Sequence, residues 1–171
     1  MDAPCMNKKP HLFLTGEKGV GKSTLLKKLL EGRSERIGGF LTVRSAQAFP
    51  GKMSLHMLCP EGGEVPTEEN FLCFCPPRGD DAAAERFDRL GCAALERGGE
   101  IIVMDELGPA ETRAEAFRAM VQETLEGSVP VYGVLQKADS PLYRMIAAHP
   151  NVCLLEVTPD NRDALAEEWK K

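Results

Sequence analysis

One glycine-rich segment constrains the fold of this 171-residue chain more than any other feature. Residues 16–23 read GEKGVGKS and fit the pattern G-x-x-x-x-G-K-S/T at every fixed position. An apolar run at residues 11–15 precedes it, and residues 22–30 place four leucines on one helical face after it. A strand, a glycine-rich turn and a helix in this order predict an α/β sheet with a ligand site at the carboxyl end of the strand.

The chemistry of this turn favours a polyphosphate ligand. Glycines let successive backbone N–H groups point into one concavity, and the helix dipole adds to the attraction for anions. Lys22 is expected to reach the β- and γ-phosphates, and the Ser23 hydroxyl is expected to ligate Mg²⁺. The alternative is a plain turn with a solvated lysine, and the flanking strand and helix argue against it. We therefore expect a nucleoside triphosphate, ATP or GTP, bound with Mg²⁺.

A carboxylate pair follows a second apolar run. Residues 101–104 read IIVM and lead into Asp105 and Glu106. Asp105 is expected to hold Mg²⁺, directly or through water, because ligands of open α/β sheets bind at the carboxyl ends of strands. Glu106 is expected to orient or deprotonate the attacking water. The alternative for Glu106 is a structural role in the next loop.

The rest of the chain alternates between extended and helical patterns. Extended segments are expected at 39–44, 53–58, 70–75, 101–104, 129–135 and 152–157, and helices at 22–30, 82–97, 112–125 and 141–148. A last helix is expected to be capped by Thr158 and Pro159. We expect one domain over residues 1–171, with a mostly parallel sheet, helices on both faces and a β-rich insertion beside the sheet at about 50–80.

Composition limits the partners and the location. The net charge is −5, which makes nucleic-acid binding unlikely, and no apolar run reaches the ~20 residues that cross a bilayer. The six cysteines are irregularly spaced, which favours reduced thiols in the cytoplasm. Cys59, Cys73 and Cys75 lack a fourth metal ligand, so we expect free thiols there. Lys137, in a polar turn after an extended segment, is placed to approach the nucleotide.

Four segments together resemble the P-loop nucleoside-triphosphatases related to the cancer-related NTPase, the THEP type. They are residues 16–24, 38–44, 105–108 with Glu111, and 158–162. They follow the order found in that family and span nearly the whole chain. The resemblance implies a RecA-like α/β sandwich that hydrolyses several nucleoside triphosphates slowly and with Mg²⁺.

The resemblance also implies a set of site residues. Lys22 and Glu106 would be catalytic, and Ser23 and Asp105 would hold the metal. The residues expected to contact the nucleotide are Gly16, Glu17, Lys18, Gly19, Val20, Gly21, Lys22, Ser23, Thr24, Asn161 and Arg162. Asn161 and Arg162 would lie by the base or ribose, although Asn161 equally suits a capping role in the first helical turn.

Two departures from the family leave other functions open, and one is that residues 51–80 match it poorly and are rich in cysteine. The other is that the family carries a lysine just after the Asp-Glu-Leu/Ile-Gly run, where this chain has Pro109 and Ala110. Loss of that lysine would weaken hydrolysis if it stabilises charge in the transition state. The alternatives are a nucleotide or nucleoside kinase that uses the same loop, and a nucleotide-dependent binding switch with little turnover.

Overall fold

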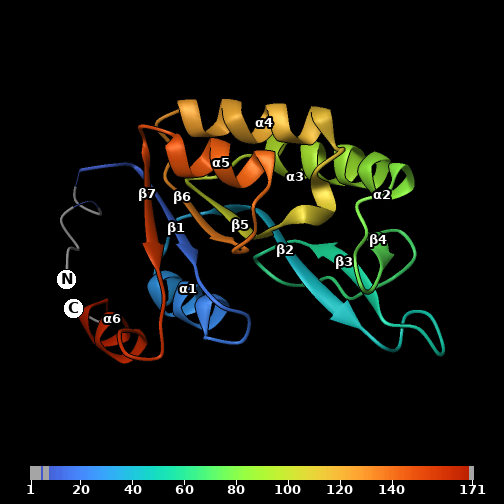
Figure 1. The fold of residues 1–171 in the computed structure, drawn as a ribbon, viewed down its shortest axis with the longest axis horizontal. Coiled ribbons are helices and arrows are strands. Elements are labelled where there is room, and N and C mark those ends of the chain that lie inside the picture. The colour runs from blue at the N-terminus through green and yellow to red at the C-terminus, as the bar shows by residue number, and fades with distance from the viewer. Residues whose placement is uncertain (1–4, 6–7, 170–171) are drawn as a thin grey trace.

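The computed structural model describes residue 5 and residues 8–169, and its strands form one mixed sheet (Figure 1). The strand order is β4-β3-β2-β5-β6-β1-β7. The strands are β1 (His11–Thr15), β2 (Ile37–Ser45), β3 (Ser54–Leu58), β4 (Phe71–Phe74), β5 (Ile101–Leu107), β6 (Val131–Leu135) and β7 (Val152–Glu156). From β2 to β7 every neighbouring pair is parallel, whereas β3 and β4 run antiparallel at one edge. The predicted mostly parallel sheet is confirmed.

Helices cover both faces of this sheet, as the alternating pattern predicts. They are α1 (Lys22–Leu30), α2 (Asp81–Arg86), α3 (Cys92–Glu96), α4 (Glu115–Glu126), α5 (Pro141–Ala148) and α6 (Arg162–Glu168), with a π-helical segment η1 (Phe87–Gly91) and a 3-10 turn η2 (Pro109–Glu111). Figure 1 shows α2 to α5 on one face and α1 with α6 on the other. No helix in the described part of the chain is long and apolar enough to cross a membrane.

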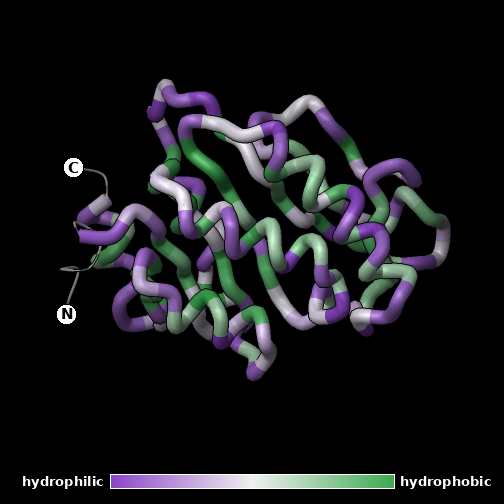
Figure 2. The backbone as a smooth tube through the Cα atoms, turned by 90° about the horizontal axis from the view of Figure 1, so that it is seen from above, coloured by the Kyte–Doolittle hydropathy of each residue, from purple (hydrophilic) through white to green (hydrophobic). Residues whose placement is uncertain are grey.

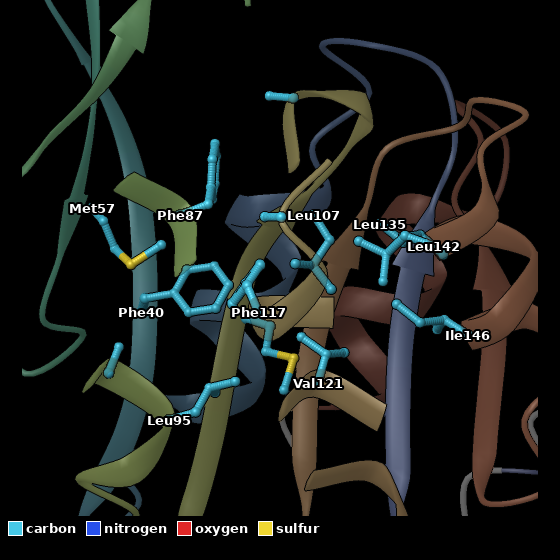
Figure 3. Close-up of a cluster of buried hydrophobic side chains, with 14 of the residues drawn as sticks. Phe40, Met57, Phe87, Leu95, Leu107, Phe117, Val121, Leu135, Leu142 and Ile146 are labelled. Carbon is cyan, nitrogen blue, oxygen red and sulfur yellow. The ribbon is translucent and has the colours of Figure 1, made fainter. Parts of the chain in front are cut away.

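Each face of the sheet has its own apolar cluster. On the side of α2 to α5, the rings of Phe40 and Phe87 both pack on the ring of Phe117 (Figure 3). The Phe117 centroid lies 5.6 Å from that of Phe40 and 5.9 Å from that of Phe87. On the other side, Leu25 and Leu26 of α1 pack against the central strands, which explains the leucine stripe of that helix. Figure 2 shows hydrophobic stretches along the inner strands and hydrophilic residues along the outer loops.

The segment predicted as an insertion beside the sheet is instead part of the sheet. β2 is nine residues long, and its first half pairs with β5 over residues 37–41. Its second half projects beyond β5 and pairs with β3 over residues 41–45. β4 then adds to β3. β3 pairs with one edge of the projecting half of β2, whose backbone groups would otherwise be unpaired there, and β4 pairs in turn with β3.

The start of the last helix differs from the prediction. Thr158 and Pro159 do not cap it, because α6 begins at Arg162 after a turn. The Thr158 N–H donates to Asn161 Oδ1 at 2.8 Å, and the Asn161 N–H donates to Thr158 Oγ1 at 3.2 Å. These reciprocal hydrogen bonds stabilise a turn at residues 158–161 and delay the helix.

The expectation of reduced thiols is wrong for one pair of cysteines. Cys5 and Cys153 form a disulfide that ties the segment before β1 to β7. The two lie 148 residues apart, so their spacing carried no signal. Cys59, Cys73, Cys75 and Cys92 are free, and no group of three or more metal-ligating side chains occurs within the described residues.

Candidate active site

The glycine-rich turn connects β1 directly to α1. Gly19 and Gly21 have φ values of 80° and 107°, in the left-handed region that favours glycine. A Cβ on Gly16 would lie 2.4 Å from the backbone oxygen of Val157, so the turn also passes too close to its neighbour for a side chain. The pattern of glycines is therefore required by the shape of the loop.

Lys22 begins α1 and folds back over this loop. Its Nζ donates to the backbone oxygens of Gly16 and Glu17, both at 2.8 Å, and the residue is 8% exposed. Lys22 forms no ion pair with any described carboxylate. A nearly buried, unneutralised ammonium at a helix N-terminus favours an anionic ligand.

The loop meets the carboxylate of β5. Ser23 Oγ donates to Asp105 Oδ1 at 3.0 Å, across 82 residues of sequence. Asp105 is 7% exposed, and its burial raises the pKa of the carboxyl, against the lowering effect of the Ser23 hydrogen bond. The strand continues beyond Asp105 to Leu107, but the carboxylate still lies next to the loop, as expected.

The glycine-rich loop and Lys22 border a cavity of about 420 Å³, which we call the phosphate cavity, and Asp105 lines a neighbouring cavity. Of the predicted residues, the phosphate cavity is lined by Gly16, Glu17, Lys18, Gly19, Gly21, Lys22, Ser23, Thr24 and Glu106. Arg44, Gln136 and Lys137 complete the lining. Glu106 thus faces the same space as the glycine-rich loop, although the two segments are far apart in sequence.

A family model described as NTPase matches residues 11–169. The chain belongs to the NTPase family. It is 29% identical over 170 residues to the nucleoside-triphosphatase THEP1 of Aquifex aeolicus, covering 92% of this chain and 95% of the relative. The THEP1 of Thermotoga petrophila is 28% identical, with 92% and 89% covered. The predicted family and the expectation of an enzyme that hydrolyses nucleoside triphosphates are confirmed.

Two solved structures resemble this NTPase in fold. The crystal structure of THEP1 from Aquifex aeolicus has a TM-score of 0.69 at 26% identity and covers 92% of this chain and 95% of that one. The solution structure of a human cancer-related nucleoside triphosphatase has a TM-score of 0.62 at 25% identity and covers 92% and 94%. The predicted P-loop α/β fold is confirmed.

Asn161 and Arg162 lie apart from the phosphate cavity of this NTPase. The Asn161 side chain donates through Nδ2 to the Glu156 backbone oxygen at 2.9 Å, and its Oδ1 accepts from Thr158. It therefore holds the turn before α6. Arg162 lines a separate hollow of about 260 Å³ together with Val20, Gly21 and Thr24. Because Gly21 and Thr24 border both spaces, this hollow adjoins the phosphate cavity.

Arg44 is the site residue that sequence reasoning missed. It lies in the projecting half of β2, is exposed, and its guanidinium forms no salt bridge within the described residues. The segment 38–44 was part of the family resemblance, but nothing in it assigned Arg44 a role. Only the pairing of β2 with β5 shows that this cation reaches the phosphate cavity.

Glu111 is part of the family resemblance, but its burial near the site could not be predicted from sequence. It is 2% exposed, and its Oε1 accepts from the Gly108 N–H. Burial is the main cause that raises the pKa of this carboxyl to about 8. Lys137 is more exposed, with its Nζ 2.8 Å from Glu156 Oε1 and 3.5 Å from Glu17 Oε1 at the rim of the phosphate cavity.

Proposed function

We propose that this NTPase hydrolyses nucleoside triphosphates in a Mg²⁺-dependent reaction at the phosphate cavity, and that the 16–24 loop binds the phosphates. The observation that carries the proposal is the contact of 3.0 Å between Ser23 Oγ and Asp105 Oδ1. It brings a hydroxyl and a carboxylate, both oxygen ligands, to the edge of a cavity lined by backbone amides and Lys22. Magnesium bound to nucleotide phosphates uses one or two such protein ligands.

The residues at this point fit a magnesium ion. Ser23 and Asp105 offer hard oxygen atoms, with no cysteine or histidine sulfur or nitrogen in the pair. Burial disfavours the ionised form of Asp105, so a cation beside it would relieve that penalty. When bound, Mg²⁺ would offset charge on the β- and γ-phosphates.

Glu106 is the proposed general base. It follows the metal-binding carboxylate on β5, and its side chain borders the phosphate cavity. Its backbone N–H donates to Thr42 Oγ1 at 3.2 Å, which fixes the main chain from which the carboxylate projects. The carboxylate would accept a proton from the water that attacks the γ-phosphorus.

Arg44 is proposed to stabilise the charge that develops during phosphoryl transfer. The family lysine after the Asp-Glu-Leu/Ile-Gly run is absent here, and Pro109 and Ala110 occupy that place. Arg44 lines the phosphate cavity with a cation that forms no salt bridge within the described residues. A guanidinium can contact two phosphate oxygens at once, which suits this task.

The nucleoside is proposed to lie in the hollow beside α1. Arg162 and Val20 line this space, and Thr24 connects it to the phosphate cavity. A planar guanidinium can stack on the flat face of any nucleobase. Such stacking fits the use of several nucleotides. Asn161 would act indirectly, because its amide holds the turn that leads to Arg162.

A cytoplasmic location belongs to the same proposal, because the cytoplasm holds nucleoside triphosphates and Mg²⁺ in abundance. The disulfide between Cys5 and Cys153 is the feature that fits a more oxidising compartment. Imaging of a fluorescent fusion of the full chain tests the location.

Release of inorganic phosphate from ATP, GTP, CTP and UTP, each with Mg²⁺ and with excess EDTA, tests the proposed reaction. We expect phosphate from all four triphosphates, and only when Mg²⁺ is present. Equal rates in EDTA would remove the metal from the proposal. No phosphate from any triphosphate would refute the hydrolysis itself.

A further inference from the structure

A second cavity opens beyond the phosphate cavity. We call it the outer cavity, and Leu55, Pro76, Pro77 and Phe87 are among the residues that line it. The two cavities meet at Ser23, Arg44 and Glu106, which line both. The outer cavity therefore begins where the proposed base and the metal-binding loop come together.

The size of the outer cavity exceeds what hydrolysis requires. Its volume is about 520 Å³. A single attacking water takes about 30 Å³, whereas pockets for small organic molecules are roughly 300–1,000 Å³. Beside Glu106 there is thus space for a molecule much larger than water.

The walls of the outer cavity differ in character. Leu55 of β3, the Pro76–Pro77 pair and Phe87 of η1 form an apolar side, which a water or a phosphate group would not need. Thr42, Glu106 and Gln136 face the same space with groups that can hydrogen-bond a hydroxyl. Such a combination suits a ligand with an apolar body and a hydroxyl.

The charges of the outer cavity argue against an anionic ligand. Its cations are Lys18 and Arg44, and both also line the phosphate cavity, where a triphosphate would engage them. Asp105 and Glu106 add negative charge to the lining of the outer cavity. Glu111, which is buried in the wall and has a raised pKa, adds a hydrogen-bonding group without demanding a counter-ion. A second phosphate would therefore find no cation of its own.

We propose that the outer cavity is a phosphoryl-acceptor site for a neutral alcohol with an apolar body, such as a nucleoside, which competes with water for the γ-phosphate. The proposal rests on the proposed function, because the same loop, metal and base would serve both reactions. The apolar wall holds the body of the alcohol and directs its hydroxyl toward Glu106.

The transfer step balances without a further reactant. The hydroxyl oxygen of the alcohol forms a bond to the γ-phosphorus, and its proton passes to the Glu106 carboxylate. The bond between the γ-phosphorus and the β–γ bridging oxygen breaks, and its electron pair leaves with the nucleoside diphosphate. The products are a phosphate monoester and the diphosphate, and Glu106 then returns the proton to solvent.

The test is a partition experiment with the full chain. ATP labelled at the γ-phosphate is incubated with Mg²⁺ and, separately, adenosine, cytidine, thymidine or benzyl alcohol at millimolar concentration. Labelled phosphate monoester and labelled inorganic phosphate are separated from the same sample by chromatography. We expect that, for at least one alcohol, the ratio of labelled monoester to labelled inorganic phosphate will far exceed the molar ratio of that alcohol to water.

The outcomes separate this inference from the proposed function. Inorganic phosphate as the sole labelled product with all four alcohols overturns the acceptor site and leaves hydrolysis in place. The absence of any labelled product overturns hydrolysis as well. Monoester formed in the same small proportion as the alcohol is present in water counts as solvent competition and also overturns the site.

A matched pair of variants on β3 locates the acceptor. Leu55→Trp narrows the outer cavity, whereas Leu58→Trp places the same side chain on the same strand beside a different hollow. We expect Leu55→Trp to lower the ratio of monoester to inorganic phosphate by about tenfold or more. Leu58→Trp should keep the wild-type ratio. Equal ratios in the two variants would overturn the assignment, and circular dichroism checks that both are folded.

Discussion

At the scale of single residues, Lys22 carries a charge that no described carboxylate neutralises. We expect Lys22→Ala to reduce turnover by about 10²-fold or more, because a charge-assisted contact to the transferring phosphate is lost. Phosphate release measures the effect. Lys52→Ala, an exposed lysine before β3 that lines neither cavity, is the control and should keep normal turnover. Equal losses in both variants would point to the general positive charge of the chain instead.

A substitution of Glu106 separates the effect on nucleotide affinity from the effect on the rate of hydrolysis. We expect Glu106→Gln to lower kcat by about 10²-fold, because the amide cannot accept the proton of the attacking water. The Kd for Mg-nucleotide, measured by calorimetry, should change little. Glu123→Gln, an exposed position on α4, serves as the control. A parallel loss of affinity and kcat would assign Glu106 a structural role.

The proposed site residues differ in how much of the sequence is needed to find them. Lys22, Ser23, Asp105 and Glu106 could be proposed from sequence, because each lies within a short motif that follows an apolar run. Arg44 could not, since it reaches the cavity through a strand pairing that joins distant segments.

At the scale of elements, the helical run from α2 to α3 packs closely on α4. A Cβ on Gly91 would lie 2.3 Å from Cδ2 of the Phe117 ring, whereas its backbone φ of −68° is ordinary for any residue. We expect Gly91→Ala to lower the free energy of unfolding by about 1–3 kcal/mol through overpacking.

Urea denaturation measures this change. Glu96→Ala, at an exposed position of α3, should stay within about 0.5 kcal/mol of the parent chain. A Gly91→Ala chain as stable as the parent would mean that the Phe117 ring moves aside without loss.

The turn after β5 makes stability depend on pH. The pKa of Glu111 is raised to about 8 by burial, so between its unfolded value and pH 8 the native state keeps a proton that the unfolded state has lost. Stability therefore falls as pH rises, with a slope that approaches about 1.4 kcal/mol per pH unit for one proton.

The variant Glu111→Gln tests this linkage. It keeps an oxygen that can accept from the Gly108 N–H but cannot ionise. Urea denaturation across pH 5 to 7, a window chosen from the raised pKa of about 8, should give a shallower slope for the variant. Parallel slopes would show that Glu111 is ionised in the folded protein.

Local sequence patterns predicted whether a segment is a helix or a strand better than they predicted how the strands pair. α5 spans Pro141–Ala148, the range that its periodicity predicts. The predicted helix start at Thr158 and Pro159 was wrong because Thr158 can also form a hydrogen-bonded turn with Asn161. Sequence alone does not distinguish that turn from a helix cap. The arm of β3 and β4 could be recognised as extended, but its place in the sheet depends on β2 projecting past β5.

At the scale of the whole molecule, nucleotide binding should stabilise the fold, because the ligand joins segments from both halves of the chain. A non-hydrolysable Mg-nucleotide at a hundred times its Kd adds about 2.7 kcal/mol to the free energy of unfolding. For a chain of this size, each kcal/mol raises Tm by about 2–4 °C. Differential scanning calorimetry should record this rise in the parent chain and little of it in Lys22→Ala. A full shift in that variant would place the nucleotide elsewhere.

The overall architecture was predictable because alternating strands and helices admit few arrangements, and parallel neighbours require crossover helices. The disulfide between Cys5 and Cys153 was not, because it depends on the whole chain having folded. The same holds for the outer cavity, whose walls come from β3, η1 and the turn after β5.

The long second strand has a consequence for how such an enzyme can diverge. One end of β2 is bound to the strand that carries the acidic pair, and the other end is bound to the antiparallel arm. Insertions or replacements in the arm would change the lining of the outer cavity, to which Leu55 belongs, and would leave the 16–24 loop unchanged. New reaction partners could therefore evolve on this scaffold while the glycine-rich loop and the acidic pair of β5 stay unchanged.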